Sequence, residues 1–149
     1  MPRLQLDDFL PYRLSVADNA VSQVVERAYA HHALTVPQWR VIAVLGEADA
    51  LSQRELVDRT RMDKLTVSRA ARTLETRRLV LRRDDASDGR TLRLSLSAQG
   101  RRIYGEVIPA ALDAERRVVS QLGAGDRRAL EKLLRKVEAA ALACANGIK

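Results

Sequence analysis

Several side chains that can bind base edges or phosphates lie close together in the middle of the chain. Arg69 and Arg72 carry guanidinium groups that can each donate two hydrogen bonds to a guanine edge. Thr66 and Ser68 carry hydroxyls that can reach a base or a phosphate, and Leu65 can contact a thymine methyl group. Apart from Thr66, these residues follow a helical spacing that places them on one face. The chemistry that this set predicts is nucleic-acid recognition.

The positive charge of the chain is concentrated around these residues. Residues 52–102 hold fourteen Lys and Arg against seven Asp and Glu, and their net charge of +7 equals that of the whole 149-residue chain. The remaining basic and acidic residues therefore cancel. A neutral scaffold with one basic segment indicates a surface that meets a polyanion.

Three successive helices are predicted through this part of the chain, each beginning at a residue that can cap it. Thr35 and Gln38 have the spacing of a capping box, Ser52 and Glu55 have it as well, and Asp63 can cap the helix that follows. In that last helix Val67, Ala70, Ala71 and Leu74 are predicted to face the core. The three helices are predicted over residues 35–47, 52–59 and 63–78.

A β-hairpin is predicted after the third helix. Residues 92–96 alternate between apolar and polar side chains, residues 79–83 can pair with them, and the connection is rich in turn formers. A short helix, a turn, a second helix and a hairpin form a winged helix-turn-helix, whose second helix enters the major groove of DNA. Arg90 at the hairpin tip can reach the backbone or the minor groove, and Asp88 is placed to orient it.

Phosphate contacts are expected beside this second helix. Lys64 carries a cation at the start of the helix, and the preceding helix presents its N-terminal amides near Ser52 and Gln53. Longer helices are predicted on either side, over residues 7–31, over about 98–121 and from Asp126 onward. The fold class is therefore mainly α with a small β-hairpin.

The sequence resembles the MarR family of multiple antibiotic resistance regulators. The run from Leu51 to Thr60, followed by Asp63 to Arg69, looks like the DNA-binding core of that family, and Asp88-Gly-Arg90 followed by residues 94–100 is similar to its D-x-R…L-x-L-T-x-x-G wing pattern. The order and length of the helices match over nearly the whole chain. Two positions depart from the pattern, since Arg78 stands where Gly is frequent and Ser97 where Thr is usual.

The resemblance implies a homodimer whose first and last helices intertwine and whose two winged lobes read a pseudo-palindrome in double-stranded DNA. It also implies that Arg90 enters the minor groove with support from Asp88, and that Thr66, Ser68 and Arg69 match the recognition helix. The organisation it implies is a single domain over 1–149, with a DNA-binding lobe over 35–97 and dimerisation helices over 7–34 and 98–149.

Proteins of this family often bind small anionic or aromatic effectors between the dimer helices and the winged lobe. The candidate residues for such a pocket are Tyr12, His31, His32, Trp39 and Arg40. An alternative interpretation makes Trp39 a core residue and has Arg40 contact a phosphate or an acid.

The sequence gives little support for metal, cofactor or redox chemistry. His31 and His32 are adjacent and point in different directions on a helix, and no further His or nearby Cys accompanies them. The single cysteine, Cys144, lies at helical core spacing, which is typical of a buried small hydrophobe. With no apolar stretch of membrane length and acids in place of a signal-peptide core, we expect a cytoplasmic protein.

These observations favour a DNA-binding transcription regulator, and a repressor rather than an activator on resemblance alone. No phosphate-binding glycine loop, Ser/His/Asp set or H-E-x-x-H motif indicates an enzyme. The alternative is a winged-helix protein that holds DNA without reading its sequence, or an adaptor that binds another protein.

Overall fold

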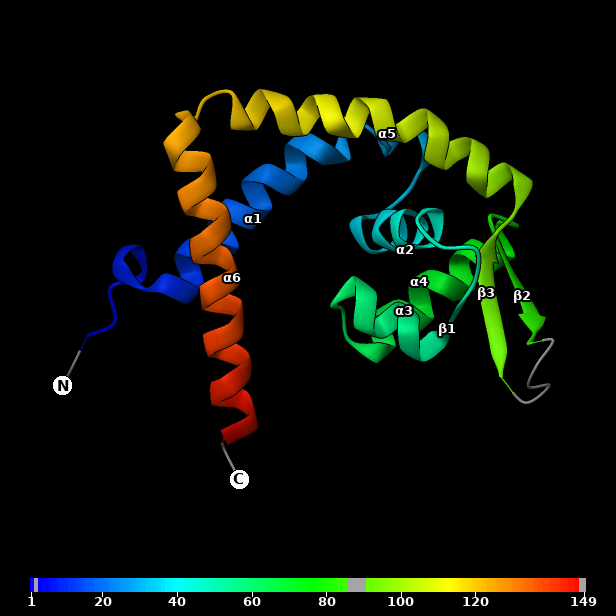
Figure 1. The fold of residues 1–149 in the computed structure, drawn as a ribbon, viewed down its shortest axis with the longest axis horizontal. Coiled ribbons are helices and arrows are strands. Elements are labelled where there is room, and N and C mark those ends of the chain that lie inside the picture. Colours follow the sequence, from blue (N-terminus) through cyan, green and yellow to red (C-terminus); the bar gives the residue numbers. More distant parts are fainter. Residues whose placement is uncertain (2, 86–90, 148–149) are drawn as a thin grey trace. The chain divides into compact units, whose positions relative to one another are not determined.

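The structure is a computed structural model that describes residues 1, 3–85 and 91–147. The chain separates into two compact units, residues 1–114 and 115–149, and each is described by itself. Figure 1 shows the elements in chain order. The helices are η1 (Leu6–Asp8), α1 (Leu10–Glu26), η2 (Ala30–His32), α2 (Val36–Gly46), α3 (Gln53–Thr60), α4 (Lys64–Thr76), α5 (Ala98–Val119) and α6 (Ala124–Gly147), and the strands are β1 (Leu51–Ser52), β2 (Val80–Asp84) and β3 (Leu92–Leu96).

The starts of α2, α3 and α4 confirm the predicted caps. Thr35 and Gln38 form a capping box, Ser52 and Glu55 form a second, and the carboxylate of Asp63 accepts a hydrogen bond from a backbone amide of the first turn of α4. Each side chain satisfies an amide that has no partner inside its own helix. The bounds of these three helices therefore differ from the prediction by at most two residues.

The longer helices differ more from the prediction. The first predicted helix, over 7–31, is divided into η1, α1 and η2, with Pro11 in the first turn of α1. Ser97 caps α5, because its hydroxyl accepts a hydrogen bond from the Gly100 amide at 3.0 Å. The last helix begins at Ala124, two residues before the predicted Asp126.

The predicted hairpin is part of a three-stranded antiparallel sheet with the order β1-β3-β2. Leu51 pairs with Leu94, and Val80 pairs with Leu96. The third strand, β1, was not predicted because its two residues are too few to show an alternating pattern. It ties the start of α3 to the central strand of the sheet.

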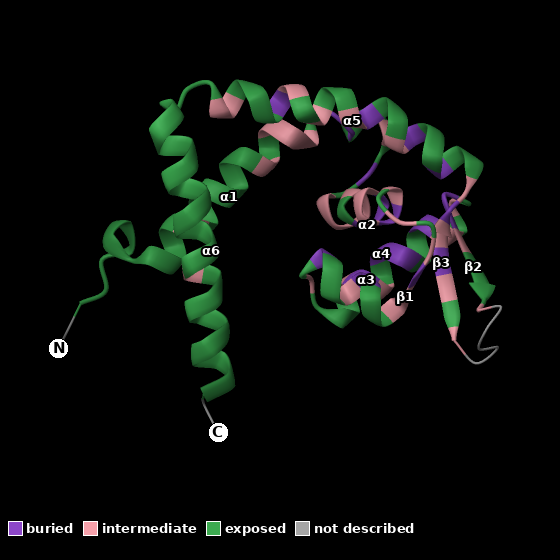
Figure 2. Ribbon diagram, viewed as in Figure 1, coloured by how far each residue is buried: buried purple, intermediate pink, exposed green. Residues whose placement is uncertain are grey.

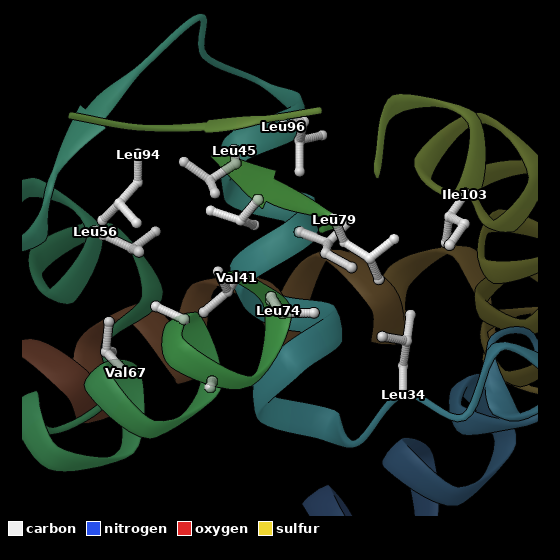
Figure 3. Close-up of a cluster of buried hydrophobic side chains, with 14 of the residues drawn as sticks. Leu34, Val41, Leu45, Leu56, Val67, Leu74, Leu79, Leu94, Leu96 and Ile103 are labelled. Carbon is white, nitrogen blue, oxygen red and sulfur yellow. The ribbon is translucent and has the colours of Figure 1, made fainter. Parts of the chain in front are cut away.

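The core of the first unit lies between α2, α3, α4 and the sheet (Figure 3). Val41, Leu45, Leu56 and Leu94 are fully buried there. The predicted core face of α4 is confirmed, since Val67, Ala70, Ala71 and Leu74 are all buried. Burying this face directs the remaining faces of α4 to the surface.

The second unit contributes little buried surface of its own. Figure 2 shows α6 almost entirely in the colour of exposed residues, and none of its described residues is buried. Its exposed apolar side chains include Leu130, Leu133, Leu134 and Leu142. Among the described residues, no helix is both long and apolar enough to cross a membrane.

Candidate nucleic-acid interface

One face of α4 projects from the core, and we call it the recognition face. It consists of Leu65, Ser68, Arg69 and Arg72, which the sequence placed together. Leu65 is 58% exposed, Arg69 and Arg72 are exposed, and Ser68 is partly buried. An exposed leucine beside two exposed guanidinium groups provides both apolar and hydrogen-bonding contacts to base edges.

Thr66 has a more restricted role than its hydroxyl suggests. Its Oγ1 donates a hydrogen bond of 2.6 Å to Asp63 Oδ2, and its amide donates one of 2.8 Å to Asp63 Oδ1. These bonds lower the pKa of Asp63, the larger effect coming from the hydroxyl, and keep the capping carboxylate ionised. The hydroxyl proton of Thr66 is therefore engaged at the helix cap, and only its oxygen lone pairs can accept from DNA.

A hollow of about 430 Å³ lies beside the recognition face. It brings together four of the predicted residues, Gln53, Lys64, Ser68 and Arg72, with Glu75 and Arg82. Arg82 was not predicted as a member of this site. It lies on β2 and makes a two-pronged pair with Glu75 at 2.7 and 3.0 Å, a contact that sequence spacing does not reveal.

The start of α3 is occupied by its own carboxylate. The Ser52 amide donates to Glu55 Oε2 at 2.7 Å, and the Glu55 amide donates to Ser52 Oγ at 3.2 Å. The hydrogen bonds from Ser52 lower the pKa of Glu55. The predicted phosphate donors here were the backbone amides near Ser52 and Gln53, and the cap engages that of Ser52. The side chain of Gln53 lines the hollow, but its Nε2 is buried and has no hydrogen-bond partner among the described residues.

A second hollow, of about 250 Å³, separates α4 from the start of α2. Arg69 and Thr66 line it from α4, and Thr35, Pro37 and Gln38 line it from α2. The sequence identified Thr35 and Gln38 only as a helix cap. That capping motif was nevertheless a usable signal, because it marks a helix start, where backbone amides face outward.

The wing residues Asp88 and Arg90 lie outside the described residues. On either side of them the chain is held by a hydrogen bond of 2.8 Å from the Asp85 amide to the Thr91 carbonyl. The predicted roles of Asp88 and Arg90 therefore stay predictions.

A third hollow, of about 210 Å³, contains two of the predicted effector residues, Trp39 and Arg40. Trp39 stacks on Tyr29 with ring centroids 5.4 Å apart and on Tyr104 at 6.3 Å. Tyr29 was missed because it is separated from Trp39 by a 3-10 helix and a turn. The other lining residues are Val21, Ser22, Val25, Val36 and Ala43.

Tyr12, His31 and His32 do not line this hollow. Tyr12 is 39% exposed on α1. The rings of His31 and His32 lie 4.0 Å apart, and His32 Nε2 lies 3.4 Å from Glu106 Oε2. Burial lowers the pKa of His32, and His31 adds to that effect. Among the described residues, no group of three His, Cys, Asp or Glu is placed to hold a metal ion.

Cys144 is exposed on α6, so the interpretation as a buried small residue is wrong for the single chain. The helical spacing correctly indicated an apolar stripe on this helix. No described residue of α6 is buried, however, so that stripe has no cover within the chain.

Two successive short helices, of which the second is basic, followed by a hairpin in a three-stranded sheet, define the winged helix-turn-helix class of DNA-binding proteins. Residues 33–91 match the family model described as the MarR family. The chain belongs to the MarR family of transcription regulators.

Curated relatives and solved structures agree with this assignment. The regulator TtmR of Methylorubrum extorquens is 32% identical over 102 residues, which are 68% of this chain and 52% of TtmR, so the chain spans about half the length of that relative. The crystal structure of a probable transcriptional regulator from Pseudomonas aeruginosa is 30% identical, with a TM-score of 0.78, and the match covers 89% of this chain and 99% of that one.

A third similar protein is BpsR of Bordetella bronchiseptica, whose DNA binding is regulated by 6-hydroxynicotinic acid. It is 24% identical with a TM-score of 0.82, and the match covers 92% of this chain and 98% of BpsR, a likeness that shows the fold alone. Curated relatives that match 87% of the chain are named as repressors.

Proposed function

We propose that this chain is a sequence-specific DNA-binding transcription regulator, acting as a repressor, that binds a pseudo-palindromic operator as a homodimer. The observation that carries the proposal is the recognition face of α4. The opposite face of α4 is buried in the core. Arg69 and Arg72 therefore project outward together, with Lys64 beside them.

Base reading and phosphate binding fall to different residues of this interface. Arg69 and Arg72 can each bind a guanine edge through two hydrogen bonds, and Leu65 can contact a thymine methyl group. Lys64 and Gln53 line one hollow at the starts of α4 and α3, where the exposed ammonium group of Lys64 can pair with a phosphate oxygen.

A homodimer accounts for apolar residues that the single chain leaves in water. On α6, Leu130, Leu133 and Leu134 are about half exposed or more and follow helical spacing. On α1, Leu10 and Val16 are exposed as well. A contiguous exposed apolar face such as that of α6 marks an interaction surface. We propose residues 7–34 and 98–149 as the dimerisation segments and 35–97 as the lobe that reads DNA.

The hollow at Trp39 and Arg40 suits a small aromatic acid. The exposed Arg40 guanidinium can pair with a carboxylate, and the partly exposed ring of Trp39, which stacks on the buried ring of Tyr29, can pack against a ligand ring. BpsR responds to a ligand of this chemical type. We propose that such an effector releases the operator by changing the spacing of the two recognition helices.

Selection of bound sequences from a random DNA library at moderate salt tests the proposal. The expected result is a palindrome whose half-sites lie about one helical turn, roughly 10 bp, apart. The double variant Arg69→Ala/Arg72→Ala should lose this preference. Arg3→Ala, which removes an exposed arginine outside both the lobe that reads DNA and the dimerisation segments, is the control and should select the same palindrome.

Two outcomes would contradict the proposal. Recovery of unselected sequence with steeply salt-dependent affinity would indicate a protein that holds DNA without reading it. Absence of binding to any duplex at low salt would favour the adaptor that binds another protein.

A further inference from the structure

Arg93 joins the wing to the helix-turn-helix. It lies on β3, the central strand, where it pairs with Ser52 of β1 on one side and with Arg83 of β2 on the other. Its Nε donates a hydrogen bond of 2.8 Å to Asp85 Oδ2, and its Nη1 donates one of 2.9 Å to Glu55 Oε2. One guanidinium thus connects the end of β2 with the first turn of α3.

The Glu55 oxygen that Arg93 contacts also takes part in the cap of α3. Oε2 accepts from the Ser52 amide at 2.7 Å and from Arg93 at 2.9 Å. The carboxylate is therefore held from its own helix and from the sheet at once. A movement of the hairpin relative to α3 would have to break one of these two charge-assisted hydrogen bonds.

We propose that Arg93 is a positioning residue for DNA binding, one that acts through Glu55 and Asp85 and does not itself contact DNA. This inference rests on the proposed function. Its role is to hold the hairpin and the helix-turn-helix in one arrangement before DNA arrives. Because the hairpin and the helix-turn-helix are already ordered, binding to DNA does not cost the conformational entropy of ordering them, and the affinity is higher.

The charges of Arg93, Glu55 and Asp85 allow a positioning role to be distinguished from direct attraction or repulsion between these side chains and DNA. Arg93 is paired with two carboxylates, so it is a poor candidate for an additional phosphate contact. If Glu55 acted only as a negative charge near DNA, Glu55→Gln would tighten binding. If it holds Arg93, the same substitution should weaken binding, even though Gln at this position still permits the capping box.

The experiment measures the affinity of the protein for its selected operator in the wild type and in three variants, Arg93→Gln, Glu55→Gln and the double variant. We expect Arg93→Gln to lower affinity by about tenfold, Glu55→Gln to lower it by less, and the double variant to be no weaker than Arg93→Gln, as residues in one network are not additive. The double variant has the net charge of the wild type. Recovery of wild-type affinity in it, or tighter binding by Glu55→Gln, would overturn the proposal.

A control and a second measurement complete the test. Arg83→Gln removes the same charge from the strand position opposite Arg93, where the side chain has no ion-pair partner among the described residues. Its effect should add to that of Glu55→Gln. The salt dependence of binding should keep its slope in Arg93→Gln, whereas loss of a phosphate contact would reduce the slope by about 1.

Folding and function are separated by further readouts. Each variant should unfold cooperatively within a few degrees of the wild type, and Arg93→Lys, which keeps the charge but not the fork geometry, should recover only part of the affinity. Failure of the wild type to bind any duplex would reject the proposed function. If the wild type binds its operator and Arg93→Gln binds it equally well, only the role of Arg93 is rejected.

Discussion

The Arg77 guanidinium donates a hydrogen bond of 2.6 Å to the backbone carbonyl of His32, 45 residues earlier in the chain. A second bond of 2.9 Å reaches the carbonyl of Ala33, the left-handed residue that ends η2. Arg77 follows the last residue of α4. It therefore ties the end of that helix to the turn between α1 and α2.

Replacing Arg77 with Met should lower the free energy of unfolding by about 1–2 kcal/mol, because two charge-assisted hydrogen bonds are lost from a partly buried site. Urea unfolding at one fixed protein concentration measures the change, since a dimer makes stability depend on concentration. Arg72→Met, the same substitution at an exposed position of α4, should change stability by less than about 0.5 kcal/mol. Equal losses in both variants would contradict the role of Arg77.

His32 should make the fold less stable in mild acid. Burial lowers its pKa in the folded state from the ordinary 6.5, His31 and Arg77 act in the same direction, and Glu106 opposes them. The unfolded chain then binds the proton more readily, so stability is complete above pH 6.5 and falls as the pH drops below it. We expect the melting temperature of His32→Gln to depend less on pH than that of the wild type between about pH 7 and 5. His31→Gln, at an exposed position, is the matched control and should keep most of the slope.

Arg78 adopts a backbone conformation that favours glycine. Its φ is +57°, and the Leu79 amide bonds back to the Leu74 carbonyl at 2.9 Å, which closes the end of α4. Arg78→Gly should raise the free energy of unfolding by about 0.5–1 kcal/mol, because relief of the left-handed strain exceeds the entropy cost of glycine. Arg72→Gly, within regular helix, should instead lower it by about 1 kcal/mol. Destabilisation by both glycines would show that Arg78 is not strained.

Local signals in the sequence predicted the helix starts and the core face of α4 correctly. Caps such as Ser52 and Asp63 act within four residues, so the sequence contains all of the relevant information. The recognition face followed for the same reason, because helical spacing fixes which residues share a side.

Contacts between distant residues could not be predicted in this way. Glu55 and Arg93 are 38 residues apart, and nothing in their spacing indicates that they pair. The strand β1 forms because Leu51 and Ser52 pair with β3, more than 40 residues later in the chain. The exposure of Cys144 was missed for a different reason, since an apolar stripe predicts burial without showing which molecule covers it.

Arg69 and Lys64 should fail in different ways when each is replaced with alanine. Arg69→Ala should weaken operator binding by about 1–3 kcal/mol and relax the preference at one base position, because a guanine edge loses its partner. Lys64→Ala should weaken binding to all sequences to a similar extent and reduce the salt slope by about 1. Titration of operator and random duplexes at several salt concentrations distinguishes the two. Equal losses on both duplexes for Arg69→Ala would show that this side chain does not read sequence.

The leucines of α6 should control assembly. Leu133 is 57% exposed in the single chain, and a glutamate there would place a charge within the apolar face that we assign to the dimer. Leu133→Glu should shift the protein from dimer to monomer in analytical ultracentrifugation at micromolar concentration. It should also weaken operator binding, because one lobe then reads one half-site. Ala139→Glu introduces the same charge on the opposite side of the helix and should remain dimeric. A Leu133→Glu protein that stays dimeric with full operator affinity would place the dimer contact elsewhere on the chain.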